Sequence, residues 1–191
     1  MFIEQDRIFR LDEQTVVLDD FQADGWILDI GGGGEAVIGQ LKGAQVVAID
    51  LLPRELEEAP DGPLKIVMDA RELKFLDCTF HTVTAFFSFM FIRPGDHEKV
   101  FREIYRVLAS GGQFMMWDVE IQQRPAPEID VMAFPLQVRL PGTVIHTGYG
   151  TPYTEKRITL HDYISQARDA GFKWTEQGFA KQTFFCKFQK S

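Results

Sequence analysis

Residues 26–35 constrain the fold of this chain more than any other stretch. An apolar run, broken only by Asp29, leads straight into four consecutive glycines, and Glu35 then opens a helix-compatible segment that ends near residue 41. Glycine adopts backbone angles that other residues avoid, and it lets a ligand lie directly against the main chain. A helix that starts behind the glycines presents unpaired N–H groups and the positive end of its dipole. The stretch therefore predicts a buried strand, a tight turn and a helix that together form the floor of a pocket for a nucleotide-type ligand.

The glycines alone do not identify that ligand. Gly31, Gly33 and Ala36 match the Gly-x-Gly-x-x-Gly/Ala spacing of dinucleotide-binding turns. Similar glycine-rich turns also connect strands to helices in proteins that bind nothing there. An NAD(P)-dependent oxidoreductase therefore stays an alternative on these residues.

The composition predicts one soluble globular domain over residues 1–191, with 45% hydrophobic and 25% charged residues. The net charge of -8 argues against a nucleic-acid partner, because a phosphate backbone needs a basic face. Cys78 and Cys186 lie far apart without metal-ligand spacing, so we expect reduced thiols and a cytoplasmic location. No apolar run reaches transmembrane length and the first residues do not resemble a leader, so we expect no membrane association.

Apolar, strand-like runs alternate with helical patterns from residue 26 onward. The helix after Asp96, a candidate N-cap, has the clearest stripe of apolar residues, and Ser110, Gly111 and Gly112 are expected to stop it. Such alternation predicts an α/β fold with a doubly wound, mainly parallel seven-stranded sheet that ends in an antiparallel hairpin. The expected strands are 26–30, 45–50, 64–68, 82–87, 113–117, 173–179 and 183–188, and the expected helices are 35–41, 53–58, 97–108 and 160–170.

Two segments stand outside this alternation. Residues 1–24 form an N-terminal arm in which 8–11 and 15–18 favour strands, and we expect a small hairpin or an extended arm there. Residues 120–157 hold five of the nine prolines, and 135–140 with 144–149 suggest a hairpin around Gly142. A long insertion after a sheet strand is more often functional than idle, so we interpret it as a lid or substrate wall; a surface excursion without ligand contact is the alternative.

Four of the expected strands end in a carboxylate, at Asp29, Asp50, Asp69 and Asp118. Ligands of open α/β sheets bind outside the carboxyl ends of the strands, so these side chains are expected at one edge. Each taken alone is as easily explained as a turn former or helix cap. Asp50, after the second strand, is well placed to accept both hydroxyls of a ribose. Asp69 is placed to accept from an exocyclic amine.

These pieces together resemble a class I S-adenosylmethionine-dependent methyltransferase. The matching stretches are 28–34, 47–51, 68–75 and 101–112. The last is the most specific, because it is similar to the Arg-Glu-x-x-Arg-Val-Leu-x-x-Gly-Gly signature of that family. The resemblance covers about residues 26–118, and it implies a Rossmann-like methyltransferase fold whose reversed terminal hairpin a nicotinamide-binding domain lacks.

The resemblance implies S-adenosyl-L-methionine as cofactor and gives roles to individual positions. Gly31 and Gly33 would line its methionine and ribose, and Asp50 would bind the ribose hydroxyls. Leu51 would pack on the adenine, which Asp69 and the Ala70 backbone would recognise. Phe87 and Ser88 would border the sulfonium. With the strand-end carboxylate included, the expected cofactor-binding set is Asp29, Gly31, Gly33, Asp50, Leu51, Asp69, Ala70, Phe87 and Ser88.

Two positions depart from the family pattern. Glu35 stands where the third glycine is usual, and it either sits at the helix N-terminus or contacts the amino group of the cofactor. His81 replaces an aspartate before the fourth strand, and we expect a surface or capping residue there.

The expected activity is direct methyl transfer to an unidentified acceptor. A small molecule is favoured by the size and acidity of the chain, and by the absence of an Asn-Pro-Pro-Tyr-like run where residues 88–91 stand. A non-catalytic S-adenosylmethionine-binding protein is an alternative from another class, and the oligomeric state stays open. A general base is needed only if the acceptor loses a proton. Candidates without recognisable spacing, each as easily a packing residue, are Asp118, Glu120, His146, Tyr149 and Tyr153.

Overall fold

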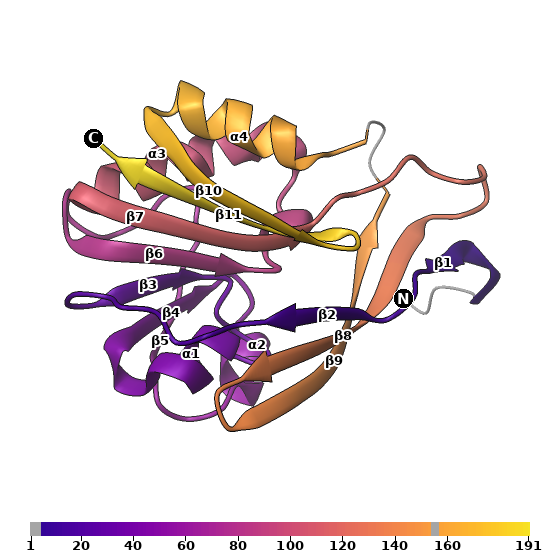
Figure 1. Cartoon of the computed structure of the whole chain (residues 1–191), viewed down its shortest axis with the longest axis horizontal. Helices are drawn as coiled ribbons and strands as arrows, with labels where there is room; N and C mark the ends of the chain where they lie inside the picture. Colours follow the sequence, from indigo (N-terminus) through magenta and orange to yellow (C-terminus); the bar gives the residue numbers. More distant parts are fainter. Residues whose placement is uncertain (1–4, 154–156) are drawn as a thin grey trace.

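The computed structural model describes residues 5–153 and 157–191, and its centre is a seven-stranded sheet (Figure 1). The strand order is β10-β11-β7-β6-β3-β4-β5, with the last five parallel and β10 and β11 antiparallel. This confirms the expected α/β fold and its reversed terminal hairpin. The strands are β3 Ile27–Ile30, β4 Val46–Asp50, β5 Leu64–Val67, β6 Phe80–Phe86, β7 Leu108–Val119, β10 Phe172–Ala180 and β11 Thr183–Lys190.

Helices form where the apolar periodicity predicts them. On α3 the side chains that recur at helical spacing are completely buried, including Phe101 and Ile104. The start of α4 is fixed by Thr159 and Asp162, which bond to each other's backbone N–H as a capping box. The α-helices are α1 Val37–Lys42, α2 Pro53–Glu58, α3 His97–Val107 and α4 Leu160–Asp169, and the short 3-10 turns are η1 Gln5–Arg7, η2 Gly43–Gln45, η3 Phe89–Phe91 and η4 Pro94–Asp96.

The ends of α3 differ from the expectation. Asp96 occupies the N-cap position, but its side chain makes no capping bond and instead accepts from Arg71 Nη1 at 3.0 Å. The helix ends at Val107, before the two glycines that were expected to stop it. Those glycines belong to an irregularity at the start of β7, where the pairing with β6 shifts register. Gly112 is required there, because a Cβ would lie 3.1 Å from the carbonyl oxygen of His81.

A second sheet of four strands is built around the insertion (Figure 1). Strands β8 Val131–Leu140 and β9 Thr143–Pro152 form an antiparallel hairpin, so the expected hairpin is confirmed and is longer than predicted. Strands β1 Ile8–Arg10 and β2 Gln14–Val17 do not pair with each other. Both lie parallel to β8, so of the two expected alternatives the N-terminal hairpin is wrong, and residues 8–17 instead form an arm that packs on the insertion.

The β8–β9 hairpin is anchored in the hydrophobic core. Alternate side chains of β8 point inward and are almost fully buried, which is the period-2 pattern of a strand with one covered face. The inner face of β8 is therefore part of the hydrophobic core. The inward residues are Met132, Phe134, Leu136 and Val138, each at most 2% exposed.

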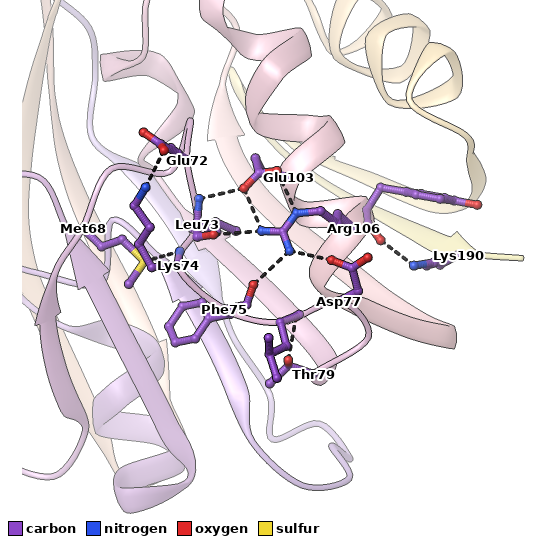
Figure 2. A network of polar contacts seen from close by, with 12 residues as sticks. Met68, Glu72, Leu73, Lys74, Phe75, Asp77, Thr79, Glu103, Arg106 and Lys190 are labelled. Carbon is purple, nitrogen blue, oxygen red and sulfur yellow. Dashed lines mark hydrogen bonds and ion pairs between the residues drawn. The ribbon is translucent and has the colours of Figure 1, made fainter.

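Arg106 of α3 holds the segment that follows β5 (Figure 2). Its guanidinium donates to the carbonyl oxygens of Leu73 and Phe75 at 2.8 and 2.9 Å, and it pairs with the carboxylates of Glu103 and Asp77. Glu103 in turn accepts from the Leu73 backbone N–H at 2.7 Å. The hydrogen bonds from Arg106 keep the pKa of the Glu103 carboxyl below its usual value. Glu103 and Arg106 of the signature stretch thus hold residues 73–77 and do not line the cleft described below.

No helix in the described parts of the chain has both the length and the apolar character to cross a bilayer.

Candidate functional site

A cleft of about 1130 Å³ runs along the carboxyl ends of β3, β4 and β6. Parallel strands end on the same edge of a sheet, and this edge is where open α/β sheets bind ligands. The loop after β6 and Gly148–Gly150 of β9 complete its walls. All nine residues of the expected cofactor set line this one cleft: Asp29, Gly31, Gly33, Asp50, Leu51, Asp69, Ala70, Phe87 and Ser88.

The glycines let the ends of three strands approach one another. The backbone N–H groups of Gly31 and Gly32 donate to the carbonyl oxygen of Ile49 at 2.8 and 2.9 Å. Gly31 has a φ of 71°, and a Cβ there would lie 2.4 Å from the Cβ of Ser88. A Cβ on Gly33 would lie 3.0 Å from Asp50 Oδ2. Side chains at these positions are thus excluded by the protein itself.

Asp29 lies beneath the glycine loop. Its side chain is almost completely buried, and Oδ1 accepts a hydrogen bond from the Thr84 hydroxyl at 2.7 Å. Burial raises the pKa of Asp29 from 3.8 to about 7, opposed by the Thr84 bond and assisted by the charge of Asp50. Asp29 is therefore partly protonated at neutral pH.

One carboxylate oxygen of Asp50 accepts a hydrogen bond from a nearby backbone N–H group, and the other oxygen faces the cleft. Oδ1 accepts from the backbone N–H of Leu52 at 2.9 Å, which fixes the carboxylate. Oδ2 faces Gly33 and has no hydrogen-bond donor in the described parts of the chain. Leu51, beside it, has a 58% exposed side chain at the rim.

Asp69 is held by a neighbouring arginine that sequence reasoning did not assign. The Arg71 guanidinium bonds to both carboxylate oxygens of Asp69, at 2.7 to 3.0 Å, and also reaches Asp96. These bonds keep the pKa of Asp69 below its usual value despite partial burial. The carboxylate is therefore ionised and fixed in orientation beside Ala70.

Phe87 and Ser88 form a strained turn after β6. Phe87 has a φ of 49° in the left-handed region, and its N–H donates to the Trp117 carbonyl at 2.8 Å. The Ser88 hydroxyl is buried and has no hydrogen-bond partner in the described parts of the chain. An unpaired buried hydroxyl is costly unless a ligand or water satisfies it.

Glu35 connects the glycine loop to the insertion. Its carboxylate accepts from the hydroxyls of Thr147 and Tyr149 on β9, the latter at 3.0 Å. The Tyr149 ring stacks on Phe87, with centroids 5.6 Å apart and planes at 18°. The departure from the glycine pattern thus has a structural reason, because a glycine could not make these contacts.

The structure does not bring the five candidate general bases together in the cleft. Tyr149 alone among them lines it, and burial together with Glu35 raises its pKa well above 10, so its hydroxyl stays protonated. Asp118 is buried and accepts from the backbone N–H groups of Met90 and Val119, at 3.2 and 2.8 Å.

The other three candidates stand elsewhere. Glu120 binds Arg157 and the backbone of Leu160, His146 is exposed on β9, and Tyr153 is buried. His81 is exposed, as expected for a surface residue. The described residues include no cluster of three side chains able to hold a metal ion.

Residues 28–116 match the family model described as a methyltransferase domain. This match, together with the fold, supports a class I S-adenosylmethionine-dependent methyltransferase. S-adenosylmethionine is the methyl donor of this family. The family match and the reversed terminal hairpin both favour S-adenosylmethionine over a nicotinamide cofactor.

Solved structures with the same fold include a protein from Pyrococcus horikoshii, at 20% identity and a TM-score of 0.62, covering 87% of this chain and 82% of that one. An S-adenosylmethionine-dependent methyltransferase from Mesorhizobium loti has 14% identity and a TM-score of 0.63, covering 88% and 92%. Another from Methanosarcina mazei has 17% identity and a TM-score of 0.61, covering 89% and 94%. No curated protein matches the chain. At these identities the structures share the fold, and their acceptors do not transfer to this chain.

Proposed function

We propose that this chain transfers a methyl group from S-adenosylmethionine to a small-molecule acceptor, and that the acceptor enters the cleft beside the β8–β9 hairpin. The observation that carries the proposal is the convergence of the nine expected cofactor residues on one cleft, to whose wall the insertion contributes Gly148, Tyr149 and Gly150. A cleft of about 1130 Å³ has room for a nucleoside cofactor and a second small molecule.

The residues of the cleft fit the cofactor chemically. The open Oδ2 of Asp50 suits a ribose hydroxyl, and the unpaired Ser88 hydroxyl suits a polar group at the methionine end. Asp69 is ionised and suits the adenine amine, with Leu51 against the ring. Carboxylates around the glycine loop favour a ligand with a positive charge.

The cofactor supplies a methyl group that is already activated by a positive sulfur. The work left to the chain is to align the acceptor and to exclude water, and alignment alone can contribute about 7 kcal/mol or more. We assign the acceptor wall to Phe87, Phe91 and Tyr149, which border the cleft on the side of the insertion. The hairpin is proposed as a fixed cover because its inner face is part of the core.

The proposal includes a small acceptor and a cytoplasmic location. The chain carries a net charge of -8, and Glu35, Glu55 and Glu58 also line the cleft, which disfavours a nucleic acid. Cys78 and Cys186 are both free thiols, as expected in a reducing compartment.

Calorimetry with S-adenosylmethionine and its demethylated product S-adenosylhomocysteine tests the cofactor assignment. We expect both to bind. Absence of heat with either ligand, or thermal protection by NAD but not by these two compounds, would overturn it. If the chain binds the cofactor but transfers methyl to no member of a broad acceptor panel, the non-catalytic alternative is favoured.

A further inference from the structure

The part of the cleft beside β9 combines aromatic rings with one carboxylate. Phe87 and Tyr149 stack on each other, and Phe91 meets Tyr149 edge-on with centroids 6.3 Å apart. Phe91 is 54% exposed, so its ring is available to a ligand at the rim. Glu35 accepts a hydrogen bond from the hydroxyl of the same tyrosine.

Glu35 keeps capacity for a ligand after its contacts within the protein are counted. An ionised carboxylate offers about four acceptor positions. Thr147 uses one on Oε1 and Tyr149 uses one on Oε2, which leaves one position on each oxygen. Because both donors come from β9, they hold the carboxylate in one orientation before any ligand arrives.

Within residues 5–153 and 157–191, no ion pair involves the carboxylate of Glu35. Arg71 is engaged with Asp69 and Asp96. Arg93, which follows Phe91 in the chain, also lines the cleft. This arginine would favour an anionic acceptor, which is the alternative to the proposal. The hydroxyl of Tyr149 keeps its proton and therefore donates to Glu35 rather than competing for a donor.

A carboxylate beside aromatic faces is the chemistry that recognises an ammonium group. We propose that the methyl acceptor is an amine, whose nitrogen binds Glu35 and whose carbon skeleton packs against Phe91 and Tyr149. This inference rests on the proposed methyl transfer. An ammonium nitrogen that gives one proton to the carboxylate of Glu35 gains a free electron pair, and Glu35 becomes a neutral acid. That pair would form the new N–CH3 bond as the S–CH3 bond breaks, so the electrons of the broken bond would stay on sulfur and S-adenosylhomocysteine would leave.

The test is a binding experiment in which no turnover occurs. Protein saturated with S-adenosylhomocysteine is titrated with benzylamine, benzyl alcohol and benzoate, followed by ligand-observed NMR. The three probes share a ring and differ in charge. We expect benzylamine to bind about tenfold more tightly than benzyl alcohol, and Glu35→Gln to remove that difference while leaving the affinity for S-adenosylhomocysteine unchanged.

Two further variants make the result specific. Glu57→Gln removes the same charge from the exposed face of α2, outside the cleft, and should retain the preference for the amine. Phe91→Ala alters a rim residue that is more than half exposed and should weaken benzylamine about threefold without unfolding the protein.

Equal binding of amine and alcohol, or a preference for benzoate, would overturn the amine assignment. So would a loss of S-adenosylhomocysteine affinity in Glu35→Gln, because Glu35 would then hold the cofactor. If the unaltered protein fails to bind S-adenosylhomocysteine, the proposed function itself is wrong, and this control separates the two failures.

Discussion

The two sheets of this molecule are assembled in different ways. In the seven-stranded sheet, β3, β4 and β5 are joined by short connections and lie side by side in chain order. In the four-stranded sheet, β1 and β2 pair with β8, which follows more than a hundred positions later. The first sheet presents the carboxylates and glycines of the cleft, whereas the second contributes its outer wall. Local patterning thus specifies the strands that carry the proposed donor residues, whereas long-range pairing with β1 and β2 completes the sheet that carries Tyr149.

Phe134→Ala should have the largest effect, because it removes a buried aromatic ring of the β8–β9 hairpin. The variant tests whether the hairpin is part of the core. Phe134 is 2% exposed and contacts both Phe87 and Tyr149, with ring centroids 5.9 and 6.1 Å away. We expect a loss of about 3 kcal/mol of unfolding free energy in urea titrations. The matched change Phe179→Ala, at a side chain that is 57% exposed, should cost less than about 0.5 kcal/mol. Equal effects of the two would show that the hairpin is only loosely attached.

Asp50→Ala tests the other sheet at the point where the cofactor is proposed to bind. Loss of the fixed carboxylate should weaken S-adenosylhomocysteine about a hundredfold in calorimetry, with little change in stability. Asp61→Ala removes an equal charge from an exposed turn and should leave the affinity within about twofold. A similar loss of affinity in both variants would show that Asp50 acts only through its charge at long range.

Arg106→Met probes the network that holds residues 73–77. Arg106 and Glu103 are only 31% and 20% exposed, so the variant leaves a partly buried carboxylate and two carbonyls without their donor. We expect a loss of about 2 kcal/mol of unfolding free energy. Arg102→Met, on the exposed face of the same helix, should change it by less than about 0.5 kcal/mol. If both variants are equally stable, the signature arginine has a role other than fixing this segment.

Asp29→Asn should be visible as a change in the pH dependence of stability. Burial raises the pKa of Asp29 to about 7 in the folded protein, whereas its ordinary pKa of 3.8 applies once the chain unfolds. The unaltered protein therefore loses stability as pH rises between these two values, and asparagine, which does not titrate, removes that loss. The variant should gain about 3 kcal/mol of unfolding free energy relative to the unaltered protein between pH 4 and pH 7 in urea titrations. A constant difference across that range would contradict the raised pKa.

The sequence predicted the seven-stranded sheet because each of its elements carries a local signal. Strands β3 and β4 read as short apolar runs, and the buried stripe of α3 recurs at helical spacing. Asp50 and the glycines could be placed at the cleft because carboxyl ends of parallel strands meet at one edge. Their roles toward the cofactor remain proposals.

The errors concern contacts that no local pattern encodes. β1 and β2 are short and favour strands, but nothing in their residues specifies β8 rather than each other as partner. Glu35 stood out as a departure from the glycine pattern, and its partners Thr147 and Tyr149 lie in the other sheet. Asp96 lost its expected capping role because Arg71 provides a stronger, charged donor.

The parallel pairing of β1 and β2 with β8 has a consequence for synthesis. Residues 8–17 leave the ribosome well before their partner strand exists, and they must stay unpaired until residue 139 has been made. Closing so long a loop is slow, so this edge should be among the last parts of the protein to form. During that interval the two short strands are accessible to proteases and chaperones.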